Sequence, residues 1–267
     1  MNSRTITFRK WMSRIVLTLF AAAVFFGGDR MGTRDEANQD FVYSLKEGNI
    51  KGVDYYFVKI PKFNGGRLIR FKVGFADNTP GSVKTVGEFA AEKEALVTIN
   101  GGFFRRKDGT NLPYGAVIID GEPVYAGSPY KNVRNAQTLA IMEDGTFRYY
   151  KSGALDIDKM IGDGVRHAIT GRLPVITEGK ETDYDDSEGR FQIIGYDDRN
   201  YYIFTSEDGL RISDAAAFLL TEGLKEAYVM DGGGSVSTNI CNERINPGRD
   251  KESREERKVA TFIYAAR

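Results

Sequence analysis

The stretch Ala227-Tyr228-Val229-Met230-Asp231-Gly232-Gly233-Gly234-Ser235 joins an apolar run to a carboxylate and three consecutive glycines. The apolar half is typical of a short buried strand. Glycines add no side chain to a core and cost backbone entropy, so three of them indicate that something approaches the main chain closely. They also permit positive φ and expose amide N–H groups, which favours a concave site for an anionic or hydroxyl-rich ligand. The alternative is a tight turn capped by Asp231.

A second junction follows the same pattern. The apolar run 95–99 leads into Asn100-Gly101-Gly102-Phe103-Phe104, so a polar side chain and adjacent glycines again follow a predicted strand. The two phenylalanines either wall a pocket or belong to the core. Two strand ends of this kind predict one shared site.

The rest of the chain predicts β-sheets with a few short helices, an α+β fold of mixed sheets. The spacing of Thr85 and Glu88 is that of a capping box, which predicts a short helix and makes Glu88 a cap rather than a catalytic acid. A second helix is expected over 214–222, capped by Ser213 and ended by Gly223. Apolar and aromatic runs separated by turn signals predict the strands, at 53–60, 68–75, 95–99, 114–119, 122–125, 139–142, 146–150, 168–176, 191–196, 201–205, 227–230 and 259–264.

The N-terminal residues are of a different kind. Basic residues precede an apolar run from Ile15 to Phe26, which is shorter than the roughly 20 residues that span a bilayer. We therefore expect residues 1–28 to be a signal peptide or an uncleaved N-terminal anchor, 29–40 to be a polar linker, and 41–267 to be one catalytic domain. The predicted location is secreted, periplasmic or cell-envelope associated, with membrane contact only through an uncleaved N-terminal segment.

The composition limits the partners, disulfides and metal sites that the chain can have. Lys and Arg together number 37, as do Asp and Glu, so the net charge gives no argument for a nucleic acid or a membrane surface as partner. Cys241 and His167 are the only residues of their types, which excludes an intramolecular disulfide and makes a zinc site improbable. The acidic run 183–189 lacks EF-hand spacing and predicts a solvated loop. We expect no metal and no cofactor, although a divalent cation on Asp231 stays open.

Taken together, these motifs resemble the phosphodiester glycosidase family, over roughly residues 50 to 265. The resemblance is carried by 98–104, by 169–176 with Gly179, by 227–235, and by Arg257 before the last predicted strand. It implies hydrolysis of the bond between a sugar's anomeric carbon and a phosphodiester oxygen, which releases free sugar and a phosphate monoester. The implied partner is a carbohydrate or sugar-phosphate substrate.

The resemblance also implies roles for individual residues. Arg190 matches an arginine that precedes a strand containing a glycine, here Gly195. The chain departs from the family pattern at 191–193, where Phe-Gln-Ile replaces a more usual Arg-Thr-Ala type of run. The implied catalytic residues are Asp231, Asn100 and Arg190, and the implied substrate-binding residues are Gly101, Gly102, Gly232, Gly233, Gly234, Ser235 and Arg257.

The chemistry of a phosphate leaving group is consistent with so few carboxylates. An ordinary glycosidase uses two carboxyl groups, one of which protonates the leaving oxygen. Phosphate departs as an anion, and arginines or amides can stabilise it. Asp231 would then be the general base or the electrostatic partner of the anomeric centre, with Arg190 and Arg257 as phosphate binders. The alternatives are surface ion pairs for the two arginines and a turn cap for Ser235.

The sequence therefore predicts an exported hydrolase that cleaves a sugar-1-phosphodiester bond in an extracytoplasmic glycan or exopolysaccharide. The alternative is a non-catalytic protein of the cell envelope that binds a glycan or sugar phosphate.

Overall fold

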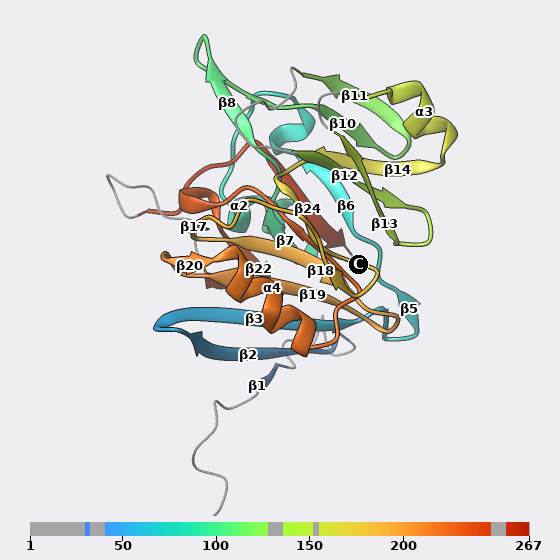
Figure 1. Ribbon diagram of the computed structural model, residues 1–267. Helices are drawn as coiled ribbons and strands as arrows, with labels where there is room; N and C mark the ends of the chain where they lie inside the picture. Colours follow the sequence, from blue (N-terminus) through green and yellow to red (C-terminus); the bar gives the residue numbers. More distant parts are fainter. Residues whose placement is uncertain (1–29, 33–40, 128–135, 152–154, 247–254, 267) are drawn as a thin grey trace, which may run out of the picture.

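The computed structural model describes residues 30–32, 41–127, 136–151, 155–246 and 255–266 (Figure 1). The predicted signal peptide or anchor, residues 1–28, lies outside the described residues. Residues 30–32, within the predicted linker, form β1 and pair with β2. The largest sheet has eight strands in the order β1 Arg30–Gly32, β2 Tyr43–Ile50, β3 Val53–Pro61, β19 Asn200–Ser206, β18 Gln192–Tyr196, β21 Glu226–Val229, β15 Leu173–Thr177 and β16 Lys180–Glu181.

Two five-stranded sheets complete the main architecture. The first has the order β11 Glu122–Ala126, β10 Ala116–Ile119, β14 Val165–Thr170, β12 Gln137–Met142 and β13 Phe147–Lys151. The second has the order β23 Glu243–Asn246, β22 Thr238–Ile240, β7 Ala95–Asn100, β24 Thr261–Ala266 and β6 Lys72–Phe75. Three small pairs are added: β4 Phe63–Asn64 with β5 Arg67–Leu68, β8 Phe104–Lys107 with β9 Thr110–Pro113, and β17 Glu188–Gly189 with β20 Leu210–Arg211.

The predicted fold class is confirmed: the chain consists of β-sheets with a few short helices. We expected mixed sheets, whereas every pairing between the named strands is antiparallel. Two predicted strands are interrupted. The run 68–75 divides into β5 and β6, and the run 168–176 divides into β14 and β15 at Gly171 and Arg172.

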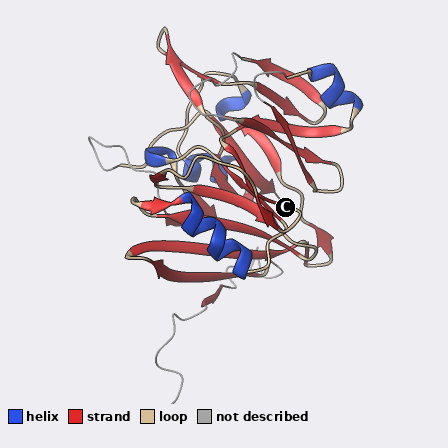
Figure 2. Cartoon of the chain, viewed as in Figure 1, coloured by secondary structure: helices blue, strands red, loops and turns tan. Residues whose placement is uncertain are grey.

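The core has two main parts, one between the three large sheets and one between the eight-stranded sheet and a helix. Ile194 and Ile203 of the eight-stranded sheet share one apolar cluster with Ile99 of β7 and Leu139 of β12, so all three large sheets contribute to it. The opposite face of the eight-stranded sheet packs against helix α4, Ile212–Thr221 (Figure 2). No helix in the described part of the chain is long and apolar enough to cross a membrane.

The helices are short. Helix α2, Val86–Glu92, begins with the predicted capping box: Glu88 N donates to Thr85 Oγ1 at 3.1 Å, and Thr85 N donates to Glu88 Oε2 at 2.8 Å. Helix α3 spans Ile157–Gly162. The prediction that Ser213 caps α4 is wrong, because the helix already begins at Ile212. Instead, the backbone N–H of Ser213 donates to Oδ1 of Asp186, at 3.0 Å, so the acidic run supplies the cap.

Asp186→Ala is therefore expected to lower the free energy of unfolding by about 1 kcal/mol, because it removes an acceptor and a negative charge from the first turn of α4. The Ser213 N–H lowers the pKa of the Asp186 carboxyl, so this contribution is present at neutral pH and is lost in acid. Urea denaturation measures the change. Asp185→Ala is the control, because Asp185 is exposed and its side chain makes no hydrogen bond among the described residues. Equal losses in both variants would contradict the cap.

Candidate active site

The two strand ends meet, as the sequence predicted. The side chain of Asn100, the last residue of β7, donates from Nδ2 to the main-chain oxygen of Asp231 at 2.8 Å. In return, Asp231 N donates to the carbonyl of Gly101 at 3.2 Å. Asn100 Oδ1 also accepts a hydrogen bond from Ser237 N at 3.1 Å. The fully buried Asn100 therefore holds the main chain on both sides of the glycine loop.

Gly101 and Gly102 allow close packing of three strands. A Cβ on Gly102 would lie 2.1 Å from the carbonyl oxygen of Thr170 in β14, and one on Gly101 would lie 2.5 Å from Thr261 Oγ1 in β24. The N–H groups of both glycines donate to Thr261, to its carbonyl oxygen at 2.8 Å and to its hydroxyl at 3.2 Å. These contacts give a structural reason for both glycines. Their role in substrate binding stays a prediction.

The glycine loop approaches the main chain of Arg190. Gly233 has a φ of 59° and donates its N–H to the Arg190 carbonyl at 2.9 Å. A Cβ on Gly232 would lie 2.7 Å from the same oxygen. From Gly233, a single 3₁₀ turn runs through Gly234 to the buried Ser235. Glycine is therefore required here by close backbone approach and by a positive φ.

Asp231 is a partly buried carboxylate at this point of the fold. Burial raises its pKa to about 6, against the opposing effects of a hydrogen bond from Ser235, the charge of Arg257 and the N–H of Gly232. Gly232 N donates to Asp231 Oδ1 at 3.0 Å. Ser235 therefore contacts the carboxylate as well as closing the turn. At pH 7 the carboxyl is mostly ionised, and at pH 5 it is mostly protonated.

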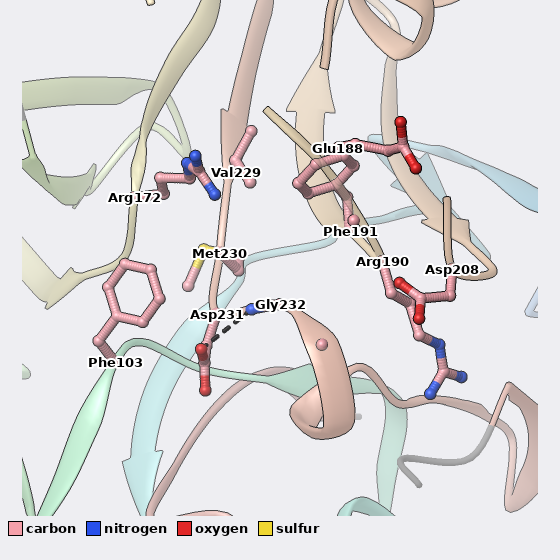
Figure 3. Close-up of a pocket in the computed structure, with 12 residues that line it drawn as sticks. Phe103, Arg172, Glu188, Arg190, Phe191, Asp208, Val229, Met230, Asp231 and Gly232 are labelled. Atoms are coloured by element: carbon pink, nitrogen blue, oxygen red, sulfur yellow. Dashed lines mark hydrogen bonds between the residues drawn. The ribbon is translucent and has the colours of Figure 1, made fainter. Parts of the chain in front are cut away.

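A cavity of about 280 Å³ opens beside this carboxylate (Figure 3). Phe103 and Arg172 stand on one side of Asp231, whereas Arg190 and Asp208 stand on the other. Phe103 is half-buried and lines this cavity, so of the two predicted roles, pocket wall or core residue, it has the first. The complete wall consists of Phe103, Arg172, Glu188, Gly189, Arg190, Phe191, Asp208, Val229, Met230, Asp231, Gly232 and Gly233.

Arg190 is held by an internal polar network and is not a surface residue. Its side chain is 5% exposed and donates from Nη2 to Asn246 Oδ1, while its Nε lies 3.7 Å from Glu207 Oε2. Asn246 Nδ2 in turn donates to Glu207 Oε1 at 3.0 Å. The guanidinium lies across the glycine turn from the Asp231 carboxylate (Figure 3). The alternative of a surface ion pair for Arg190 does not hold.

Arg257 is exposed and lies on a different side of the site. Its guanidinium carbon is 5.7 Å from the centre of the Phe104 ring, a cation–π geometry. Its charge nevertheless lowers the pKa of Asp231, so the guanidinium is close enough to influence the carboxylate. Arg257 does not line the first cavity.

A family model described as phosphodiester glycosidase matches residues 93–266, a segment that contains both junctions and Arg257. The chain belongs to the phosphodiester glycosidase family. The resemblance inferred from the motifs is thereby confirmed.

Solved structures share the fold of this phosphodiester glycosidase-family chain. The catalytic domain of zebrafish N-acetylglucosamine-1-phosphodiester alpha-N-acetylglucosaminidase, auto-inhibited by its pro-peptide, superposes with a TM-score of 0.66 at 18% identity, over 93% of this chain and 90% of that one. A hypothetical protein from Synechocystis gives 0.68 at 13% identity, over 91% and 64%. A Burkholderia pseudomallei protein described as exported gives 0.58 at 11% identity, over 96% and 89%.

A longer relative is also similar in sequence. The SPbeta prophage-derived uncharacterized protein YomE of Bacillus subtilis (strain 168) is 25% identical over 252 residues, which cover 83% of this chain. The chain spans 38% of the length of that relative.

The sequence reasoning missed Arg172 as a cavity residue of this phosphodiester glycosidase-family chain. Arg172 N donates to the Val229 carbonyl at 2.8 Å, and its Nη2 donates to Ser187 Oγ at 2.6 Å. These bonds fix the arginine beside the end of β21. The sequence does mark this position, because Gly171 and Arg172 separate residues 168–170 from the apolar residues 173–176. The prediction of a single strand over 168–176 overlooks that break.

No group of three or more His, Cys, Asp or Glu side chains in the described ranges is arranged to hold a metal ion. His167 is buried in β14, where burial lowers its pKa to about 4, and its Nδ1 accepts from Asp120 N at 3.3 Å. It does not line the cavity beside Asp231.

Proposed function

We propose that the chain is an exported hydrolase that cleaves the bond between the anomeric carbon of a sugar and a phosphodiester oxygen in an extracytoplasmic glycan. The observation that carries the proposal is Asp231, a partly buried carboxylate with a pKa raised to about 6, which lines a cavity together with Arg172 and Arg190. Membership of the phosphodiester glycosidase family supports the reaction class. The likeness to a Burkholderia protein described as exported supports the location.

In this mechanism the sugar ring occupies the cavity against Phe103, which lines it and is partly exposed. The ionised Asp231 carboxylate takes a proton from water as the water oxygen attacks the anomeric carbon. The bond between that carbon and the phosphodiester oxygen breaks, and its electron pair leaves with the phosphate. The products are free sugar and a phosphate monoester. One carboxylate can suffice, because a phosphate oxygen leaves without being protonated.

The arginines have the complementary role. A planar guanidinium binds two phosphate oxygens at once, and such charge-assisted bonds are strong where water is partly excluded. Arg172 and Arg190 line the cavity, and Arg257 acts electrostatically on Asp231 from outside it. We assign Arg172 and Arg257 to the leaving phosphate, and we assign to Arg190, whose guanidinium donates to Asn246 across the glycine turn, a supply of positive charge behind it. Asn100 and the glycine loop position Asp231, through the hydrogen bonds to its main chain and side chain.

A panel of sugar-1-phosphodiesters tests the proposal. The protein lacking residues 1–28 should release reducing sugar from at least one member of the panel, as measured by a reducing-end assay. Saturable binding of a sugar 1-phosphate without any release would instead support the non-catalytic binding protein.

The pH dependence gives an independent prediction. If Asp231 acts as an anion, kcat/KM should be constant above about pH 7 and should fall about tenfold per pH unit well below pH 6, because protonation removes the base. The control is Asp198→Asn, which changes an exposed carboxylate in the β18–β19 turn and should leave the midpoint unmoved. A rate that rises in acid would instead make Asp231 a proton donor.

A further inference from the structure

A second cavity, of about 460 Å³, lies next to the proposed active site. Phe103 lines the first cavity, and the next residue, Phe104, lines the second. Phe103 directly precedes β8 and Phe104 is its first residue, so the two cavities adjoin at the start of this strand. Arg106 and Asn111 of the β8–β9 hairpin complete one wall, and residues 255–258 form the other. The hairpin projects away from the large sheets (Figure 1).

The second cavity presents positive charge. Arg106, Arg257 and Lys258 line it and are exposed, and within the described ranges none of them lies within 4.0 Å of a carboxylate oxygen. Three exposed cations that face one cavity create a potential that attracts an anion. Of the three, Lys258 also acts electrostatically on Glu88 of α2.

Of the two acidic side chains in this wall, Glu256 is turned into the protein. Its Oε1 accepts from Ser237 Oγ at 2.9 Å and from Val86 N at 3.0 Å, and its Oε2 pairs with Arg244 at 2.9 Å. Its side chain is 7% exposed. Because these donors already neutralise it, Glu256 opposes an anionic ligand less than its formal charge suggests. Glu255 remains as the exposed acid.

Arg257 is the cation of the second cavity that also influences the first. It lines the second cavity, stacks on Phe104, and acts electrostatically on Asp231, which lines the first. A phosphodiester bound at Arg257 would therefore have its sugar beside Asp231 and its other substituent beside Arg106 and Lys258.

We propose that the second cavity binds an anionic aglycone, so that the substrate is a polyanionic glycan whose negative charge continues beyond the scissile phosphate. This inference rests on the proposed function and deepens it by naming the substrate class. The recognising groups are Arg106 and Lys258, with Arg257 shared between the aglycone and the scissile phosphate.

The kinetic experiment compares two sugar-1-phosphodiesters that differ only in the aglycone, glycerol or glycerol 3-phosphate. The wild-type protein should prefer the glycerol 3-phosphate diester. In the double variant Arg106→Gln and Lys258→Gln, the ratio of the two kcat/KM values should fall roughly tenfold, mainly through KM. The matched control, Lys180→Gln and Arg199→Gln, removes two exposed cations, one in β16 and one in the β18–β19 turn, and should retain the preference. A ratio that is the same in both double variants would overturn the proposal.

A binding experiment separates this inference from the proposed function. Glycerol 1,3-bisphosphate, titrated calorimetrically, should bind the wild-type protein and the control variant, and should bind the Arg106→Gln and Lys258→Gln variant roughly tenfold more weakly. If neither diester is hydrolysed, the proposed reaction fails, and this titration alone decides the cavity. Binding that is absent, or that the double variant leaves unchanged, would overturn the anionic site even in an active hydrolase.

Discussion

Asp231→Asn is expected to lower kcat/KM for sugar-1-phosphodiester hydrolysis roughly 10²- to 10⁴-fold, the usual effect of removing a general base. Asparagine keeps the shape of the side chain and an oxygen that can accept the N–H of Gly232, which now donates to Asp231 Oδ1 at 3.0 Å. It removes only the negative charge and the proton-accepting group. Sugar-phosphate binding should therefore persist while turnover is lost, which calorimetry and the reducing-end assay measure separately.

The same variant should fold at least as well as the wild-type protein. Burial raises the pKa of Asp231 to about 6, so ionisation of this carboxyl destabilises the folded state as the pH rises from about 4 to about 6. Asparagine avoids that cost. At pH 7 the free energy of unfolding should be unchanged or higher, and Asp198→Asn serves as the matched surface control. Undiminished turnover in Asp231→Asn would exclude Asp231 as the base, whereas lost turnover with a lower stability would indicate a folding defect.

Gly102→Ala is expected to have the largest effect on stability, a loss of about 3 kcal/mol or more, because overpacking a rigid contact forces the backbone to move. The new Cβ would lie 2.1 Å from the main-chain oxygen of Thr170, which already accepts the N–H of Phe103 at 3.0 Å. The Cβ is attached directly to the main chain and the Thr170 oxygen is part of it, so a side-chain rotation cannot relieve this contact. Strand β14 would have to separate from the Asn100 junction, so activity should fall along with stability. Urea denaturation and turnover measure the two effects.

Gly162→Ala is the matched control for this change. Gly162 is the last residue of α3, has no positive φ, and would bring its Cβ within 4 Å of nothing. Alanine also restricts the unfolded chain, so this variant should be neutral or up to about 1 kcal/mol more stable. If Gly102→Ala were as stable as Gly162→Ala, the Thr170 main chain could move away from the new Cβ without lowering the free energy of unfolding. Close packing would then not require glycine at position 102.

Much of the fold could be predicted, because most strands are apolar runs bounded by turn residues. The hairpin of β18 and β19 and the capping box of α2 are local patterns, and both form as expected. The cap of α4 was missed because Asp186, which supplies it, lies 27 residues before Ser213 in the sequence. Local propensity carries no information on such a distant partner.

Some parts of the candidate site could likewise be predicted from local patterns, whereas others could not. The meeting of Asn100 with Asp231 could be predicted because both follow apolar strands and both precede glycines. The Arg190, Glu207 and Asn246 network could not be predicted, because each residue comes from a different strand end and none forms a motif with the others. Arg172 was hidden because a break of two residues between β14 and β15 leaves the hydrophobic pattern almost continuous.

The position of strand β24 determines when the five-stranded sheet can close during synthesis. It lies between β6 and β7 and pairs with both, and its Thr261 carbonyl accepts the N–H of Gly101. On the ribosome, β6 and β7 are synthesised long before residues 261–266, so the five-stranded sheet stays open until β24 has emerged. The strand end that carries Asn100 therefore lacks its neighbour until residues 261–266 have emerged, and the site beside it can take shape only after that point.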